Sequence, residues 1–119
     1  MENYIKILEF QSNENPTIES IEKFIQEEEK KSVFIAFYKY MRSHKKWFMN
    51  YLEESFWKSK DKELSKKNKP MELIHTYFIK LIMIDNSLMK YIDEWLESET
   101  IKDDDCFETL LLTIKKERE

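Results

Sequence analysis

The sequence predicts an all-α fold, and three observations support that prediction. The 119 residues contain no glycine, which the tight turns of β-hairpins usually require. Apolar residues recur along most of the chain at spacings of three and four, the period of one helix face. Two periodic segments of similar length, 32–58 and 70–97, flank a charged stretch, as in an antiparallel pair of helices. We therefore expect a single domain, 1–119, in which four or five helices form a compact bundle around this hairpin.

The N-terminal part predicts two short helices. Residues 2–11 place apolar side chains on one helical face, but Ile5 and Ile7 also alternate as in a strand, so both structures stay open for this segment. Pro16 and Thr17 are typical of a helix start, and the apolar residues that follow them are spaced for a helix ending near Lys30 or Lys31.

The two long helices follow. Ser32 is a suitable N-cap for the first of them, which presents a mostly aromatic face up to residue 58. The stretch 58–69 is charged and nearly free of apolar residues, so we expect it to connect the two helices. Pro70 then lies near the start of the second helix, where a missing backbone N–H costs little.

Asp85 is the most unexpected residue of the second long helix. A continuous helix from 70 to 97 would place its carboxylate within an apolar face, and a buried unpaired carboxylate is costly. One solution is a helix break, with Asp85 or Ser87 capping a new segment near Leu88; the other is a pairing with His44 or with a lysine. The capping residues clustered at 85–87 favour the break.

The C-terminal segment predicts a final helix. Three aspartates at 103–105 precede its apolar residues, and Lys115, Lys116 and Arg118 follow them. Acidic residues at a helix N-terminus and basic ones at its C-terminus complement the helix dipole.

The residues that could carry chemistry do not form a complete site in the sequence. Without glycine, the phosphate-binding loops of nucleotide enzymes are excluded. Glu72 and His75 have a metal-ligand spacing but lack the further ligands that a metal needs. His44 lies in an apolar face, where a tyrosine or a backbone carbonyl can satisfy it, and Cys106 stands beside aspartates that disfavour a thiolate. We expect no enzyme activity, no catalytic residue, no cofactor and no metal.

A second apolar stripe of the helix at 70–97 predicts a protein interface. It differs from the stripe that would face the core, and a helix that is apolar on two sides is either central in its own fold or shared with a partner. Its tyrosines and tryptophan are typical of interfaces. The interface candidates are Tyr77, Ile84, Leu88, Tyr91 and Trp95.

Charge is unevenly distributed along the chain. Residues 39–69 contain ten basic and four acidic residues, although the whole chain carries a net charge of −4. A basic end of the bundle with an exposed aromatic side chain would suit nucleic acid, but arginine is scarce and no helix-turn-helix pattern is present. The candidates for such a basic patch are Lys39, Arg42, Lys46, Trp57, Lys66 and Lys67.

These patterns together predict a non-catalytic protein of the small inhibitor, immunity, anti-defence or adaptor type, which binds through an aromatic and methionine-rich helical surface. The partner would be another protein or a second copy of the chain; a nucleic-acid-associated regulator that uses residues 39–69 is the alternative. A single cysteine and the lack of long apolar runs favour a cytoplasmic protein that does not enter a membrane. The scarcity of alanine, glycine, proline and arginine indicates an AT-rich genome.

Overall fold

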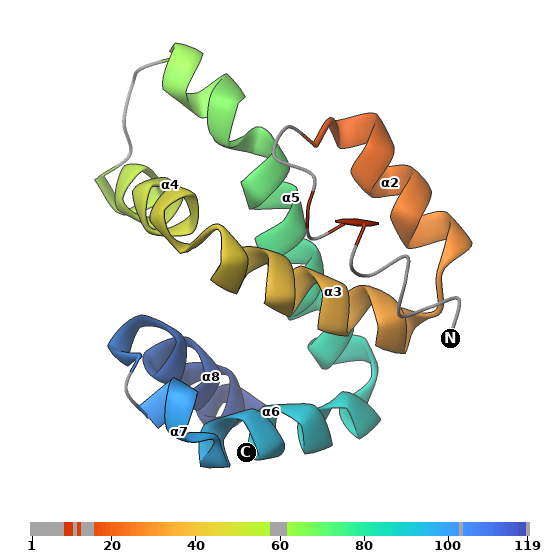
Figure 1. Cartoon of the computed structure of the whole chain (residues 1–119), viewed down its shortest axis with the longest axis vertical. Coiled ribbons are helices and arrows are strands. Elements are labelled where there is room, and N and C mark those ends of the chain that lie inside the picture. Colours follow the sequence, from red (N-terminus) through yellow and green to blue (C-terminus); the bar gives the residue numbers. More distant parts are fainter. Residues whose placement is uncertain (1–8, 11, 13–15, 58–61, 103, 119) are drawn as a thin grey trace. The chain divides into compact units, whose positions relative to one another are not determined.

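The computed structural model describes residues 9–10, 12, 16–57, 62–102 and 104–118, and all regular structure in these ranges is helical, which confirms the predicted all-α class (Figure 1). No helix of these ranges is both long enough and apolar enough to span a bilayer. The chain divides into two compact units, Met1–Phe78 and Ile79–Glu119; the single domain stays a prediction. The helices are α2 (Ile18–Glu27), α3 (Lys30–Ser43), α4 (Lys45–Trp57), α5 (Lys62–Ile84), the 3₁₀ helix η1 (Asn86–Leu88), α6 (Met89–Glu97), α7 (Glu99–Lys102) and α8 (Asp105–Arg118).

Helix α2 begins where the sequence predicts. The Thr17 hydroxyl accepts from the backbone N–H of Ser20 at 3.0 Å, and the Ser20 hydroxyl accepts from the backbone N–H of Thr17 at 3.0 Å, a reciprocal capping box. The helix ends at Glu27, a few residues earlier than expected, because Glu28 and Glu29 are extended. The segment 2–11, for which the sequence leaves helix and strand open, lies largely outside the described residues.

The first predicted long helix is divided into α3 and α4. It begins at Lys30, so Ser32 is not its N-cap but a buried residue of the first turn. It is interrupted at His44, whose φ of −113° and ψ of 41° are not helical. The Tyr40 carbonyl accepts from the backbone N–H of His44 at 3.0 Å and lies 3.1 Å from the ring Nδ1. The two rings also stack, with centroids 4.1 Å apart, so local contacts hold the break.

The second long helix departs from the prediction at both ends. Helix α5 begins at Lys62, so most of the predicted connection 58–69 is helical and Pro70 lies inside the helix. The residues before Pro70 are mostly good helix formers. Lys66, whose carbonyl the missing Pro70 N–H would have bonded, is exposed, so water can bind that carbonyl. Figure 1 shows α4 end-on and α5 along its length, so these helices cross steeply instead of forming an antiparallel hairpin.

Aromatic rings fill the core of the first unit. Phe34 stacks on Phe78 with centroids 4.4 Å apart, and both side chains are fully buried. Phe10 stacks on Phe24 at 4.5 Å and meets Phe37 at 5.4 Å, which joins the residues before α2 to α2 and α3. Stacked and tilted ring pairs of this kind stabilise a core beyond the burial of their area.

The break at Asp85 confirms the favoured alternative. Asp85 has an extended backbone, and its Oδ1 accepts from the backbone N–H of Ser87 at 3.0 Å and from the Ser87 hydroxyl at 2.6 Å. The carboxylate is therefore used as a helix cap, and η1 and α6 follow it. The predicted helix over 70–97 consequently ends at Ile84 and resumes after the cap.

The second unit is built mainly from α6, α7 and α8. The predicted C-terminal helix is present, and Asp104 caps it by accepting from the backbone N–H of Phe107 at 3.3 Å. The short helix α7 was not expected. Lys115 of α8 pairs with Asp93 of α6 at 3.1 Å. The buried side chains of these helices are Ile92, Ile101, Phe107, Leu111 and Ile114.

Candidate functional site

The predicted interface stripe is not one continuous helix face. Tyr77 belongs to the first unit, where its ring meets Phe37 edge-on at 6.1 Å. Ile84, Tyr91 and Trp95 belong to the second unit. The break at Asp85 separates Ile84, at the end of α5, from Tyr91 and Trp95 on α6. The predicted stripe assumed an unbroken helix over 70–97. Because the helix is interrupted at Asp85, the five interface candidates do not share one helix face.

Leu88 differs from the other stripe residues because it is buried, with 2% of its surface exposed. It lies in η1, directly before α6, and it precedes the buried Ile92 by four residues. Side chains at that spacing share a helix face, so Leu88 lies on the buried side of α6. It contributes to packing and offers no surface to a partner.

The remaining residues give the second unit an apolar surface. Ile84 is 56% exposed and the neighbouring Met83 is 50% exposed, so these two adjacent large apolar side chains leave at least half of their surface to the solvent. On α6, the half-buried rings of Tyr91 and Trp95 lie 6.1 Å apart. The Lys90 ammonium lies over the Tyr91 ring at 5.2 Å. We call Met83, Ile84, Tyr91 and Trp95 the α5–α6 surface.

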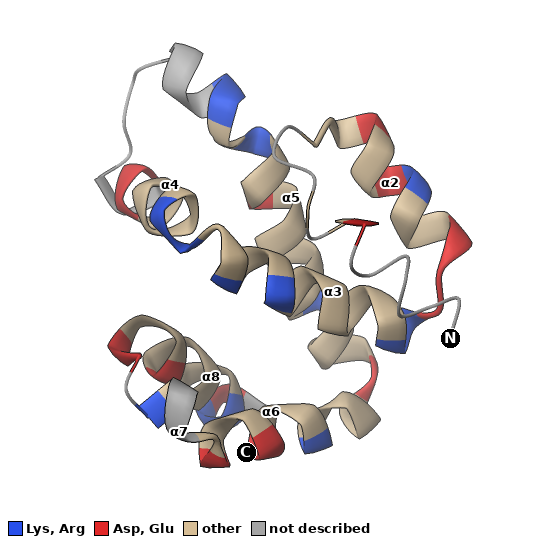
Figure 2. Ribbon diagram, in the orientation of Figure 1, with Lys and Arg blue, Asp and Glu red and all other residues tan. Residues whose placement is uncertain are grey.

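The predicted basic patch lies in the first unit and is spread over three helices. Lys39 and Arg42 of α3 are half-buried, and the Arg42 guanidinium lies 5.9 Å from the centre of the Tyr38 ring. Figure 2 shows that the basic segments of α3 lie apart from those at the start of α5. Nothing is described for the side chain of Trp57. The exposed members are Lys46 on α4 and Lys66 and Lys67 on α5.

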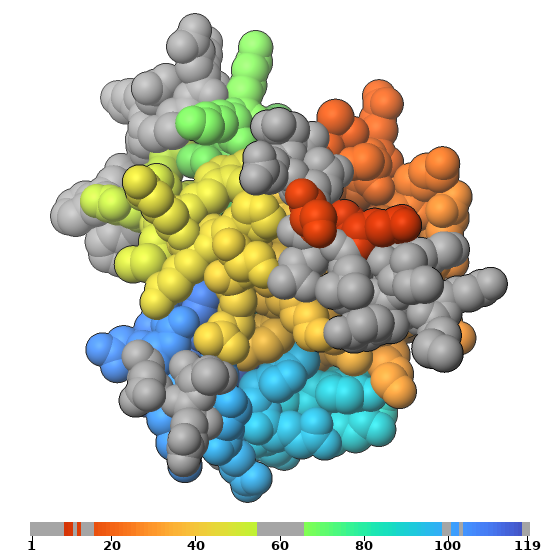
Figure 3. Space-filling model, viewed as in Figure 1, coloured from red at the N-terminus to blue at the C-terminus, as the bar shows by residue number. Residues whose placement is uncertain are grey.

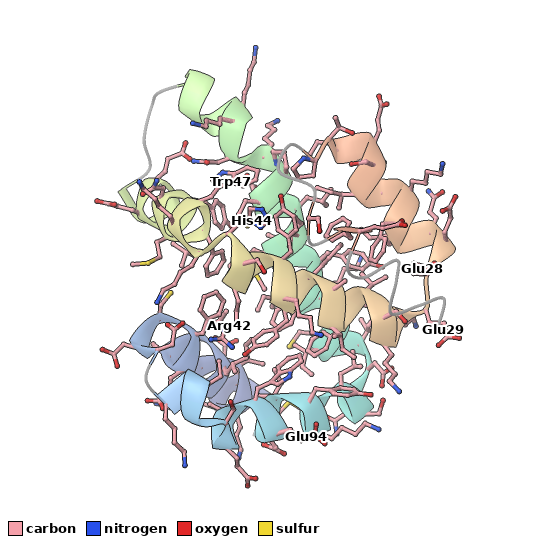
Figure 4. The ribbon with its side chains drawn as sticks, in the orientation of Figure 1. Glu28, Glu29, Arg42, His44, Trp47 and Glu94 are labelled. Carbon is pink, nitrogen blue, oxygen red and sulfur yellow. The ribbon has the colours of Figure 1, made fainter. Side chains whose placement is uncertain are left out.

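A polar network that the sequence did not predict joins α4 to α5. The Trp47 indole N–H donates to Asn68 Oδ1 at 2.9 Å, and the Asn68 amide donates in turn to Glu54 Oε2. Asn68 is 3% exposed. Figure 4 shows Trp47 and His44 together between the ribbons of α4 and α5. No local signal marks Asn68, because it stands in a lysine-rich stretch that the sequence indicated as a connection.

A tyrosine–histidine pair also lies between these two helices. Tyr51 OH is 3.0 Å from His75 Nδ1, and the ring of Phe48 meets His75 edge-on at 5.5 Å. Burial raises the pKa of Tyr51 to about 12, with smaller contributions from the carboxylates of Glu72 and Glu54. Burial also lowers the pKa of His75. Both contacts come from α4, so α4 packs against His75.

The hydroxyl of Tyr51 and the imidazole of His75 form a hydrogen bond between two uncharged groups. At neutral pH Tyr51 keeps its proton and His75 is uncharged. Glu72, which shares the metal-ligand spacing with His75, is exposed. In the ranges that the structure describes, no three His, Cys, Asp or Glu side chains gather as a metal site would require. Cys106 is half-buried and forms no disulfide with the described part of the chain.

Comparisons with protein-family models, curated proteins and solved structures find no match for this chain.

Proposed function

We propose that the chain is a non-catalytic protein-binding protein, of the small inhibitor, immunity, anti-defence or adaptor type, and that it binds through the α5–α6 surface. The observation that supports this proposal most is the distribution of exposed apolar residues. Among the described residues, the exposed large hydrophobic side chains are Met49, Met83, Ile84 and Leu112. Three of these four belong to the second unit, although it is much the shorter.

The aromatic pair of α6 supplies the anchors that such a surface needs. Tyr91 and Trp95 are one helical turn apart, so both can enter the same partner. Tyrosine and tryptophan are enriched among the residues that dominate binding energy, because they bury a large area at a small cost in side-chain entropy. Met83 and Ile84 add exposed apolar area at the end of α5, next to the helix break at Asp85, and the flexible Met83 side chain can adapt to a partner.

Charge indicates what kind of protein would bind. The second unit contains eleven acidic and six basic residues, a net charge of −5 over 79–119. An acidic surface around apolar anchors favours a partner whose docking surface is rimmed by lysine or arginine, since complementary charges speed association. A second copy of the chain would instead bring two acidic units together.

The test measures partner capture from host extract and the association state of the purified chain. Trp95→Ala should weaken capture by roughly thirty-fold or more, as expected for a hot-spot aromatic. The double change Met83→Ser with Ile84→Ser should also weaken it. Met49→Ser is the matched control, because Met49 is exposed to a similar extent, 47%, but lies in the first unit.

The opposite result is equally specific. If Trp95→Ala lowers thermal stability as much as Phe78→Ala does, while capture and association state stay unaltered, then Trp95 is a core residue. The protein-binding surface would then have to be sought outside α6.

A further inference from the structure

We infer that the junction of α4 and α5 is a binding site for single-stranded nucleic acid, in which Trp47 stacks on a base and Lys46, Lys66 and Lys67 contact phosphates. This site lies in the first unit and does not depend on the α5–α6 surface. Its basis is a contact between two lysine-rich stretches that are distant in the sequence.

The Trp47–Asn68 hydrogen bond brings those stretches together. This bond, 2.9 Å long, joins two residues that are 21 positions apart, one on α4 and one on α5. Lys46 directly precedes Trp47, and Lys67 directly precedes Asn68. The backbone of each lysine is therefore adjacent to one residue of the hydrogen-bonded pair. Figure 3 shows the coloured surface of α5 (green, from residue 66 on) beside that of α4 (yellow) on one face of the molecule.

The lysines at this junction are available for an anion. Lys46, Lys66 and Lys67 are exposed, and none of them forms an ion pair within the described part of the chain. The carboxylate of the network, that of Glu54, accepts from the Asn68 amide. Over residues 39–69 the sequence carries ten basic and four acidic residues. A region with this excess attracts phosphate groups, which release counterions when they bind.

The indole ring of Trp47 favours nucleic acid over other anionic partners. Trp47 is half-buried, its N–H is held by Asn68, and its ring meets Tyr40 at 6.4 Å and His44 at 6.5 Å, both edge-on. The ring is therefore held in one orientation before a ligand arrives, which lowers the entropy cost of stacking. Single strands expose base faces for stacking on an aromatic ring, whereas a duplex hides them. An acidic protein or an anionic lipid surface would use the lysines without this ring.

The first experiment measures the fluorescence anisotropy of a labelled thymidine oligonucleotide of roughly a dozen nucleotides, enough for one site. Binding to the full chain should weaken with salt, with a slope of log K against log salt of about −2, since three phosphates at about −0.7 each are neutralised. Changing Lys46, Lys66 and Lys67 together to glutamate should abolish binding. The matched control changes Lys30, Lys102 and Lys116, exposed lysines elsewhere, to glutamate and should retain the salt slope.

The second experiment separates stacking from structural support. Trp47→Leu should weaken binding by roughly ten- to hundred-fold, whereas Trp47→Phe, which keeps a ring, should recover most of it. Asn68→Ala removes the hydrogen bond but leaves the indole, and its binding should be closer to wild type than that of Trp47→Leu. Circular dichroism of each variant checks that it is folded.

Four outcomes would overturn the inference. They are the absence of binding at low salt, duplex binding as tight as single-strand binding, equal losses in the two lysine triple variants, and binding to phosphatidylserine vesicles but not to the oligonucleotide. Equal weakening by Trp47→Leu and Trp47→Phe would remove the stacking role of the ring and leave no reason to prefer nucleic acid.

Discussion

The two units of this chain use their large apolar side chains differently. In the first unit, phenylalanine and tyrosine rings pack on one another, as in the stacked pair Phe34 and Phe78 at 4.4 Å. In the second unit, the buried residues of α6, α7 and α8 are aliphatic apart from Phe107. Tyr91 and Trp95 stay half-exposed there. The comparison shows why aromatic content alone does not locate an interface: the first unit uses most of its rings internally, whereas the second buries Phe107 and leaves Tyr91 and Trp95 half-exposed.

Polar contacts between helices also differ between the units. In the first unit, α4 and α5 are joined by the Trp47–Asn68 bond, and Asn68 is buried. In the second, α6 and α8 are joined by the pair of Asp93 and Lys115, whose side chains are 52% and 40% exposed. Water screens the exposed pair, so it contributes little to stability, whereas loss of a buried partner leaves a polar group unsatisfied.

The largest expected effect belongs to the aromatic core. Phe34→Ala should lower the free energy of unfolding by about 3–5 kcal/mol, because it removes a fully buried ring and leaves a cavity against Phe78. Urea unfolding followed by circular dichroism measures the change. Phe34→Leu, which fills more of the space, should cost less. A loss below about 1 kcal/mol for Phe34→Ala would contradict a tightly packed aromatic core.

A smaller loss is expected for the buried amide. Asn68→Ala should lower the free energy of unfolding by about 1–3 kcal/mol, since the Trp47 N–H loses its acceptor inside the protein. The same urea experiment applies. Asn50→Ala is the matched control, because Asn50 is exposed on α4, and it should change stability little. Equal losses in both variants would show that the network adds nothing beyond helix propensity.

The pH dependence of stability should reveal His75. Because burial lowers the pKa of His75 in the folded protein, the unfolded chain binds its proton first as pH falls below the ordinary value of 6.5. The free energy of unfolding should therefore decrease as pH falls through that range. His75→Asn should flatten this decrease, as measured by urea midpoints at several pH values. The carboxylates of Glu54 and Glu72 are present in both proteins, so a decrease of the same steepness in the variant would exclude His75 as its source.

The smallest effect is expected at the exposed residues of the second unit. Met83→Ser and Ile84→Ser should each change the free energy of unfolding by no more than about 0.5 kcal/mol, because at least half of each side chain is exposed. Thermal unfolding of the purified chain measures this. A loss near that of Phe34→Ala would mean that these side chains are buried in solution, for instance by a second copy of the chain, and the contrast between the units would fail.

Features that depend on neighbours in the sequence were predicted well. The Thr17 start of α2, the Asp85 cap and the C-terminal helix all follow from a side chain that binds backbone within three residues of itself. The break at His44 is equally local, because its partner is the Tyr40 carbonyl one turn earlier, but histidine is not among the residues that commonly signal a helix end.

The sequence by itself determined the helical class, the starts of α2, α6 and α8 and the concentration of lysine between 39 and 69, because periodicity, capping and charge are properties of short stretches of chain. Only the tertiary structure decided that Asn68 and His75 face α4 and that Leu88 is buried while Ile84 is exposed. Each of these depends on which surfaces meet after the chain has folded. The hydrogen-bonded pairs between α4 and α5 are 21 and 24 residues apart in the sequence. Such contacts do not change the spacing of apolar residues in either helix, so the sequence of one helix does not identify its partner residues in the other.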